Sequence, residues 1–599
     1  MRLGRIIACL ALAPGCLLAE ESYEEIPLTD RDKRHWAWRP MQADRGTTID
    51  SLIRRDLESA GIPALAPKAS PEALLRRLHF TLTGLPPTPG EVLNFSLEDY
   101  EATIDELLSR PQYGERWAQH WLDVVRFAET DGFEHDKLRP DAWRYRDWVI
   151  DALNRDLPYD RFLAFQLAAD ELVPEDSPDR YATGFLLAGP DMPDINLEEE
   201  RRHNVLNEST GTIGAAFLGL TLSCAQCHDH KTDPVSLADF YRMRAFLENI
   251  RMPAKNKSLP PLFSELGGEP AIPTPIRIKG DFRRAGPVVE PAFLRILDPA
   301  ESGPAITETG ESTGRRRALA EWLCSPENPL VARVIANRVW MHHFGQGLVG
   351  TPNDFGRTGD RPTHPELLDR LALSLIESGW SLKALHRTIL LSSTWQQTSL
   401  TPESEDDPFW QDRLDRDPQN RLYSRRLPQR LSGEAIRDAM LQASGNLNLE
   451  AGGPGIRPPL PAEVTVTLLK GQWPVTEDET QHDRRSIYLF LRRNLRYPFF
   501  DVFDKPDANL PCGRRHQSTT APQSLTLLNS AFSAREAERL ADRLSELAPQ
   551  DAIDRAFLLT LGRRARPDEA ASSHAFIASE SWEAFALALF NLNEFVHLD

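Results

Sequence analysis

Two cysteines and a histidine stand close together in residues 222–231, at Cys224, Cys227 and His228. Two thiols three positions apart can each add to a vinyl group of haem, and the adjacent imidazole can then ligate the iron from one side. This C-x-x-C-H spacing is the attachment signature of c-type haem. We therefore predict one covalent haem, anchored by Cys224 and Cys227 and ligated by His228.

The same residues admit two other interpretations. Together with His230 they form a Cys₂His₂ set, which is a good tetrahedral donor set for zinc. A C-x-x-C pair can also be a redox dithiol, although no thioredoxin-like βαβ pattern surrounds it. If haem is bound, His230 is poorly placed to reach the opposite face of the same haem. We expect His230 instead to contact a residue that ligates the iron, or a haem propionate.

The group on the opposite side of such a haem decides between electron carriage and catalysis. The chain has seven methionines, and none stands out as a ligand. His120 shares a helical face with Trp117 and Trp121, and one of His342 and His343 is expected to face inward. We name His120 and His343 as candidate metal ligands. The other interpretation is that each is a buried histidine whose hydrogen bonds are satisfied by its neighbours.

A polar loop ahead of Trp143 carries Asp131, Asp136 and Arg139. Carboxylates next to a tryptophan suit hydrogen bonding to sugar hydroxyls and stacking on a sugar ring. Asp131 and Asp136 are therefore the candidate catalytic residues, one of them acting as a base. The alternative is a network of caps and salt bridges that organises the loop.

A second polar group lies near the end of the chain, at Cys512, Arg514 and Arg515. Guanidinium groups bind carboxylates well, so Arg514 and Arg515 are candidates to hold the haem propionates. Cys512 is interpreted as an inert thiol.

The elements that must position these residues are mostly helical. Apolar residues recur at helical spacing in 117–125, 367–376 and 438–441, whereas the better strand patterns are limited to 276–280 and 486–490. We predict a mainly α protein with minor β structure, in two helical domains at 20–252 and 314–599. The proline- and glycine-rich segment 253–313 is the predicted irregular connection between them.

Length, charge and the first residues set further bounds. A basic start followed by an apolar run predicts a signal peptide at 1–19, and hence a periplasmic or secreted protein; a lipoprotein acylated at Cys16 is the less favoured alternative. No later stretch is long and apolar enough to predict a transmembrane segment.

A length of 599 residues predicts two or more domains, and the net charge of −19 argues against a nucleic-acid partner. Four cysteines remain after processing, too few for a disulfide scaffold, and a Cys324–Cys512 pair stays open.

Longer stretches around these residues resemble a known family. In the first half these are LLRRLHFTLTGLPP at 74–87, YGERW at 113–117, HWLD at 120–123, WRYRDWVI at 143–150, and FLGLT at 217–221 running into 224–234. This half resembles the planctomycete-type secreted cytochrome c-like domain. The second half resembles its usual C-terminal partner domain of unknown function, in NRVW at 337–340, HHFGQGL at 342–348, THPELL at 363–368, GWSLKAL at 379–385 and CGRR at 512–515.

The resemblance implies an exported haem protein, in a family for which no reaction is settled. Many such proteins carry a further cytochrome c-like module in front, so a second haem, if needed, is expected from another protein. We predict a redox protein that performs or supports oxidation of an extracellular, carbohydrate-like or polysaccharide-derived substrate and passes electrons to a soluble or membrane-bound cytochrome. The alternatives are a non-catalytic binding or assembly protein with structural haem or zinc, and a pure electron carrier.

Overall fold

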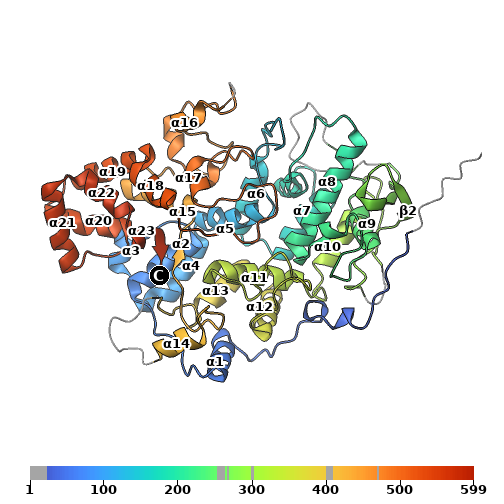
Figure 1. Ribbon diagram of the computed structural model, residues 1–599, viewed down its shortest axis with the longest axis horizontal. Coiled ribbons are helices and arrows are strands. Elements are labelled where there is room, and N and C mark those ends of the chain that lie inside the picture. Colours follow the sequence, from blue (N-terminus) through green and yellow to red (C-terminus); the bar gives the residue numbers. More distant parts are fainter. Residues whose placement is uncertain (1–22, 253–263, 266–268, 299–302, 400–408, 469–470) are drawn as a thin grey trace, which may run out of the picture.

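The computed structural model describes residues 23–252, 264–265, 269–298, 303–399, 409–468 and 471–599. The chain is mainly α, as predicted, with two small two-stranded sheets in the described part (Figure 1). The predicted signal peptide at 1–19, with Cys16, lies outside the described residues, as do parts of the predicted connection at 253–313. In the described part, no helix combines the length and apolarity needed to cross a membrane.

The first half of the chain is a series of helices with strong N-terminal signals. Thr48, Ser70 and Ser236 accept backbone N–H bonds as caps, and proline opens α2, α3 and α5. The α-helices are α1 (Ile49–Ser59), α2 (Pro71–Leu82), α3 (Pro89–Asn94), α4 (Tyr100–Ser109), α5 (Pro111–Val124), α6 (Trp143–Asn154), α7 (Tyr159–Leu172), α8 (Glu198–Ile213) and α9 (Leu237–Ala245). 3₁₀ or π segments precede or connect them: η1 (Asp32–Arg34) and η2 (Trp36–Trp38) before α1, and η3 (Leu97–Asp99), η4 (Pro178–Leu187), η5 (Gly214–Leu218) and η6 (Leu222–Ala225) between the helices.

The second half continues with helices. They are α10 (Arg315–Leu323), α11 (Val331–Phe344), α12 (Pro365–Glu377), α13 (Leu382–Leu390), α14 (Trp410–Arg416), α15 (Gly433–Ser444), α16 (Ala462–Thr465), α17 (Pro498–Val502), α18 (Ala521–Asn529), α19 (Ala531–Leu544), α20 (Pro549–Thr560), α21 (Pro567–Ser579), α22 (Trp582–Phe590) and α23 (Asn593–Val596). The short turns are η7 (Ile278–Gly280), η8 (Glu479–Asp483) and η9 (Ser486–Tyr488). The helices predicted from 117–125, 367–376 and 438–441 are confirmed as parts of α5, α12 and α15.

One of the two strand predictions is confirmed in part: Ile276 and Arg277 end strand β1, whereas residues 278–280 form the 3₁₀ turn η7. Strand β1 (Thr274–Arg277) pairs antiparallel with β2 (Ala285–Val289), and β3 (Gln429–Arg430) pairs with β4 (His597–Leu598). The strand predicted at 486–490 is wrong, because Ser486 begins the 3₁₀ turn η9. Its N–H and hydroxyl both donate to the buried Asp438 carboxylate of α15, at 2.9 and 2.6 Å. These bonds bend the backbone where the alternating pattern predicted extension.

Buried apolar residues form two separate clusters. The first runs from Ala37 to Tyr423 and includes Tyr488, and the second runs from Leu431 to Leu598 and includes Phe80 of α2. Helix α2 joins them, because its Leu82 belongs to the first cluster and its arginines hold the C-terminus: Arg76 donates to the His597 carbonyl at 2.8 Å. The C-terminus accordingly lies beside α2 in Figure 1. Helices α5 and α11, which carry the candidate ligands His120 and His343, contribute to the first cluster together with α13.

Candidate functional site

The C-x-x-C-H motif lies on a turn that follows α8. The end of α8 widens into η5, and Gly219 then adopts φ 59°, a conformation that glycine reaches without strain. Gly211 and Gly214 leave the space that the returning chain needs, because a Cβ on either would overlap the side chain of Ser223 or Leu222. The turn therefore packs tightly against the end of α8. It carries the motif in η6 and in the residues that follow, and we call residues 221–235 the C-x-x-C-H loop.

The donor atoms of the motif are accessible. Cys224 is exposed, Cys227 is half-buried, and neither is in a disulfide. His228 is exposed, and its Nδ1 lies 2.7 Å from the carbonyl oxygen of Asp229. An Nδ1–H bonded to a backbone carbonyl leaves Nε2 with its lone pair, as in most metal-binding histidines. Two free thiols and this imidazole form a donor set that fits a covalently attached haem.

His230 is used differently from His228. Its Nδ1 accepts the N–H of Asp233 at 2.8 Å, and its Nε2 lies 3.0 Å from the Thr221 hydroxyl. Both ring nitrogens therefore hold the two ends of the loop together. Within the described residues, no group of three or more His, Cys, Asp or Glu side chains is arranged to hold a metal ion.

A segment near the start of the described chain is bound to the same loop. The Tyr23 hydroxyl donates to Asp229 Oδ1 at 2.5 Å, and the N–H of Leu237 donates to the same oxygen at 2.8 Å. Glu25 accepts from Arg242 at 2.6 and 2.8 Å. Asp229, the neighbour of His228, is therefore fixed from both sides. No local sequence pattern indicates this contact, because Tyr23 and Asp229 are 206 positions apart.

The two predicted ligand histidines lie together, around Trp117. His120 of α5 stacks on His342 of α11, with ring centroids 3.7 Å apart. His343 Nε2 lies 2.8 Å from Nδ1 of His386 on α13, and the His386 ring lies 4.0 Å from that of Trp117. The hydrogen bonds and ring contacts that these four histidines make with other described side chains involve α5, α11, α13 and Trp395, and none involves the C-x-x-C-H loop.

Burial keeps these histidines neutral. It lowers the pKa of His342 and of His386 to about 3, and those of His120 and His343 well below their usual value, with neighbouring cations adding to the effect. Among the described residues, His343 Nδ1 and His386 Nε2 are buried without a hydrogen-bond partner. His386 was not predicted from the sequence, although it lies four residues after Leu382 on the apolar face of α13.

The two predicted propionate-binding arginines differ in their surroundings. Arg514 is exposed, whereas Arg515 is bound by Asp123 of α5 at 2.6 Å and by Glu434 of α15 at 2.8 Å. Burial alone would raise the pKa of Glu434, but Arg515 and Lys505 hold it well below its usual range. The charge of Arg515 is therefore already balanced within the protein.

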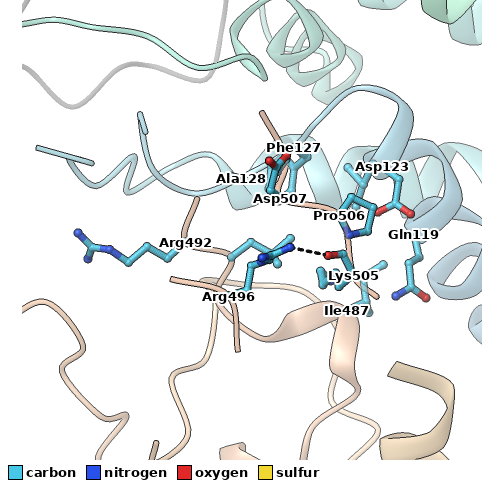
Figure 2. Close-up of a pocket in the computed structure, with 13 residues that line it drawn as sticks. Gln119, Asp123, Phe127, Ala128, Ile487, Arg492, Arg496, Lys505, Pro506 and Asp507 are labelled. Carbon is cyan, nitrogen blue, oxygen red and sulfur yellow. Dashed lines mark hydrogen bonds between the residues drawn. The ribbon is translucent and has the colours of Figure 1, made fainter. Parts of the chain in front are cut away.

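A small pocket lies beside this ion cluster, between α5 and the loop after α17 (Figure 2). Asp123, Phe127 and Lys505 line it, and Arg496 donates to the Lys505 carbonyl at 3.1 Å. Its volume of about 30 Å³ is that of a water site rather than of an organic ligand site.

The two candidate catalytic carboxylates share another cavity, of about 200 Å³. Asp136 is fully engaged, because Oδ1 accepts the N–H of Gly132 at 2.8 Å and Oδ2 pairs with Arg492 at 2.9 Å. Asp131 Oδ1 accepts from Arg139 at 2.5 Å. Burial raises the pKa of Asp131, and Arg139 opposes that rise. Of the two carboxylates, Asp136 is therefore the more fully engaged within the protein.

Comparison with known proteins places these features in two matched stretches. Residues 48–252 match the family model PSCyt2, a protein of unknown function (DUF1549). Residues 315–577 match PSD1, a protein of unknown function (DUF1553). The chain carries the planctomycete-type pair of domains of unknown function. The C-x-x-C-H loop and Asp131 lie in the PSCyt2 stretch, and His343 and Arg515 lie in the PSD1 stretch. No curated protein and no solved structure matches the chain.

Proposed function

We propose that this protein is an exported c-type haem protein, with Cys224 and Cys227 as the thioether anchors and His228 as the axial ligand. The observation that carries the proposal is the bond from His228 Nδ1 to the Asp229 carbonyl, which leaves Nε2 of this exposed side chain as the nitrogen with the lone pair. Two free thiols on the same turn supply the attachment points. A bound haem would supply one-electron chemistry at this surface.

The contacts of His230 favour haem over a zinc knot. Zinc would need a fourth donor, and the nearest histidine in sequence already uses both ring nitrogens within the loop. Haem attachment through Cys224, Cys227 and His228 leaves those bonds intact. The protein holds the motif against the end of α8, and it fixes the Asp229 carboxylate through hydrogen bonds from Tyr23 and Leu237.

The substrate-level proposal is the oxidation of a carbohydrate-like alcohol to a carbonyl in the cavity that Asp131 lines. Of the two protons released, one goes to Asp131 and the other to water, and the two electrons pass singly to two molecules of a cytochrome. The raised pKa of Asp131 suits a carboxylate that takes a proton from a hydroxyl, and its pair with Arg139 fixes the orientation of the carboxylate. Asp136 shapes the loop through Gly132 and Arg492.

The haem proposal is tested by expressing the exported chain with a cytochrome c maturation system. The denatured protein is expected to show a pyridine haemochrome spectrum with thioether-linked haem at one per chain. Cys224→Ser combined with Cys227→Ser should abolish this signal, whereas the control Cys512→Ser should retain it. An equal signal in the double variant and the wild type would contradict the proposal.

The role of Asp131 has its own test. Asp131→Asn should lower sugar-dependent reduction of an added cytochrome by about 10²–10⁴-fold, the usual contribution of a general base, with the haem content unchanged. Unaltered reduction rates in Asp131→Asn, at wild-type haem content, would remove Asp131 from the mechanism.

A further inference from the structure

The largest cavity among those described lies away from the haem motif and from Asp131. Its volume is about 430 Å³, within the usual range for small-molecule sites. Helices α2 and α3 and the start of α5 form one side, and α15 with α19 forms the other. Leu449 at its edge is 52 % exposed, so the cavity reaches the surface.

The walls of this cavity are fixed by contacts within the protein. Glu91 accepts the Thr88 N–H and hydroxyl at the start of α3, and it also pairs with Arg110. The Gln442 amide donates to the Pro86 carbonyl at 2.8 Å and so joins the two sides. The cavity is therefore largely preformed, which limits the ordering cost of binding a ligand.

One buried polar side chain on the wall is left for a ligand. The His79 imidazole is 2 % exposed, and its Nε2 lies 4.0 Å from Glu91 Oε2, which is too far for a hydrogen bond. Among the described residues, no hydrogen bond reaches the ring. Burial lowers the pKa of His79 to about 4, so at neutral pH it offers one N–H donor and one acceptor nitrogen.

The other lining groups indicate the class of ligand. The Gln112 side chain, which makes no hydrogen bond to another described residue, adds an amide with both donor and acceptor atoms. The charge of Glu91 is paired with Arg110, and Arg543 covers the carbonyls at the end of α15, at 2.9 Å from Ala443. Apart from the exposed cation Arg543, the groups left for a ligand are neutral donors and acceptors, beside apolar Leu85 and Leu447.

We propose that this cavity binds an uncharged, polyhydroxylated small molecule of the size of a mono- or disaccharide, with His79 and Gln112 as its hydrogen-bonding residues. The assignment rests on the lining of this cavity alone and does not depend on haem attachment.

Titration calorimetry of the full exported chain tests the proposal, with glucose, galactose, xylose and cellobiose as neutral probes and glucuronate as the charged probe. At least one neutral sugar should bind at one per chain. His79→Leu and Gln112→Ala should each weaken that binding about tenfold, which corresponds to the loss of one hydrogen bond. The control Gln411→Ala, on exposed α14, should leave it unchanged.

Gln112 lies at the partly exposed wall, so its variant tests the proposal even if His79→Leu fails to fold. Binding should also persist in the chain carrying Cys224→Ser and Cys227→Ser, which separates this site from the haem proposal. The assignment is overturned if no neutral sugar binds, if binding survives in Gln112→Ala at full strength, if glucuronate binds more tightly than glucose, or if the cysteine variant loses binding.

Discussion

The C-x-x-C-H loop and the histidine cluster around Trp117 contain similar residue types in opposite settings. In the loop, backbone atoms and Tyr23 hold Asp229 and His230, and the donor atoms of Cys224 and His228 face solvent. In the cluster, the imidazoles pack on one another and on Trp117 inside the first core.

This difference shows that residue type alone does not identify a metal-ligating residue. Burial makes the cluster histidines poor proton acceptors, and their rings are already in contact with one another. His228 keeps a free nitrogen because a backbone carbonyl occupies the other. The cluster also has nitrogens without a hydrogen-bond partner among the described residues, at His343 Nδ1 and His386 Nε2, but they are buried, whereas His228 is exposed. Exposure of the donor residue, rather than the presence of histidine, separates the two regions.

The largest effect is expected from a substitution at Gly280, which lies next to Cys227 of the C-x-x-C-H loop. Gly280 has φ 70°, and a Cβ there would overlap the Cys227 sulfur. Gly280→Ala should therefore lower the free energy of unfolding by about 3 kcal/mol, combining strain at positive φ with overpacking, and should reduce haem attachment. Gly303→Ala is the matched control, because Gly303 has φ 65° and nothing within 4 Å of its Cβ position. Equal losses of stability in chemical denaturation of the two variants would show that Gly280 does not position Cys227.

An acid titration tests the cluster. The pKa of His386 is about 3 in the folded chain and about 6.5 when unfolded, so the unfolded state takes up the proton first. The stability from a neutral His386 is complete above pH ~6.5 and is lost as the pH falls toward ~3, with about 2 kcal/mol lost by pH ~5. Chemical denaturation across this range should show a shallower pH dependence in His386→Leu than in the wild type. Parallel curves for the two proteins would mean that His386 is not neutral and buried.

The smallest effect concerns the attachment of the first described residues to the loop. Tyr23→Phe removes one hydrogen bond to Asp229 and should cost about 1 kcal/mol or less. Hydrogen exchange in residues 221–235 should accelerate, while exchange in α11 and α13 stays the same. If the α11 and α13 amides accelerate equally, Tyr23 stabilises the whole chain rather than the loop.

Local patterns predicted the elements more reliably than the contacts between them. The apolar spacing in 117–125 predicted α5, and the pattern at 276–280 predicted the end of β1 but not the turn η7 that follows it. The strand predicted at 486–490 was wrong because Asp438, 48 residues away, binds Ser486. No local sequence pattern indicates a hydrogen bond between residues that lie so far apart in the chain.

The candidate site was predictable in part for the same reason. The C-x-x-C-H spacing is local, so Cys224, Cys227 and His228 were identified from the sequence, and their role in haem binding stays a prediction. The pairing of His343 with His386, the neutralisation of Arg515 by Asp123, and the contact of Tyr23 with Asp229 join distant segments. They depend on how the helices pack, which residue types alone do not determine.

The central claim is that the loop carries a covalent haem, and peptide mass mapping tests it most directly. The exported chain, produced with a cytochrome c maturation system, would be digested with a protease. The mass of the peptide that contains Cys224 and Cys227 would then be measured by mass spectrometry. Our account predicts a mass increased by one haem on that peptide, with Cys324 and Cys512 unmodified. An unmodified peptide, from a sample that binds zinc at one per chain, would contradict it.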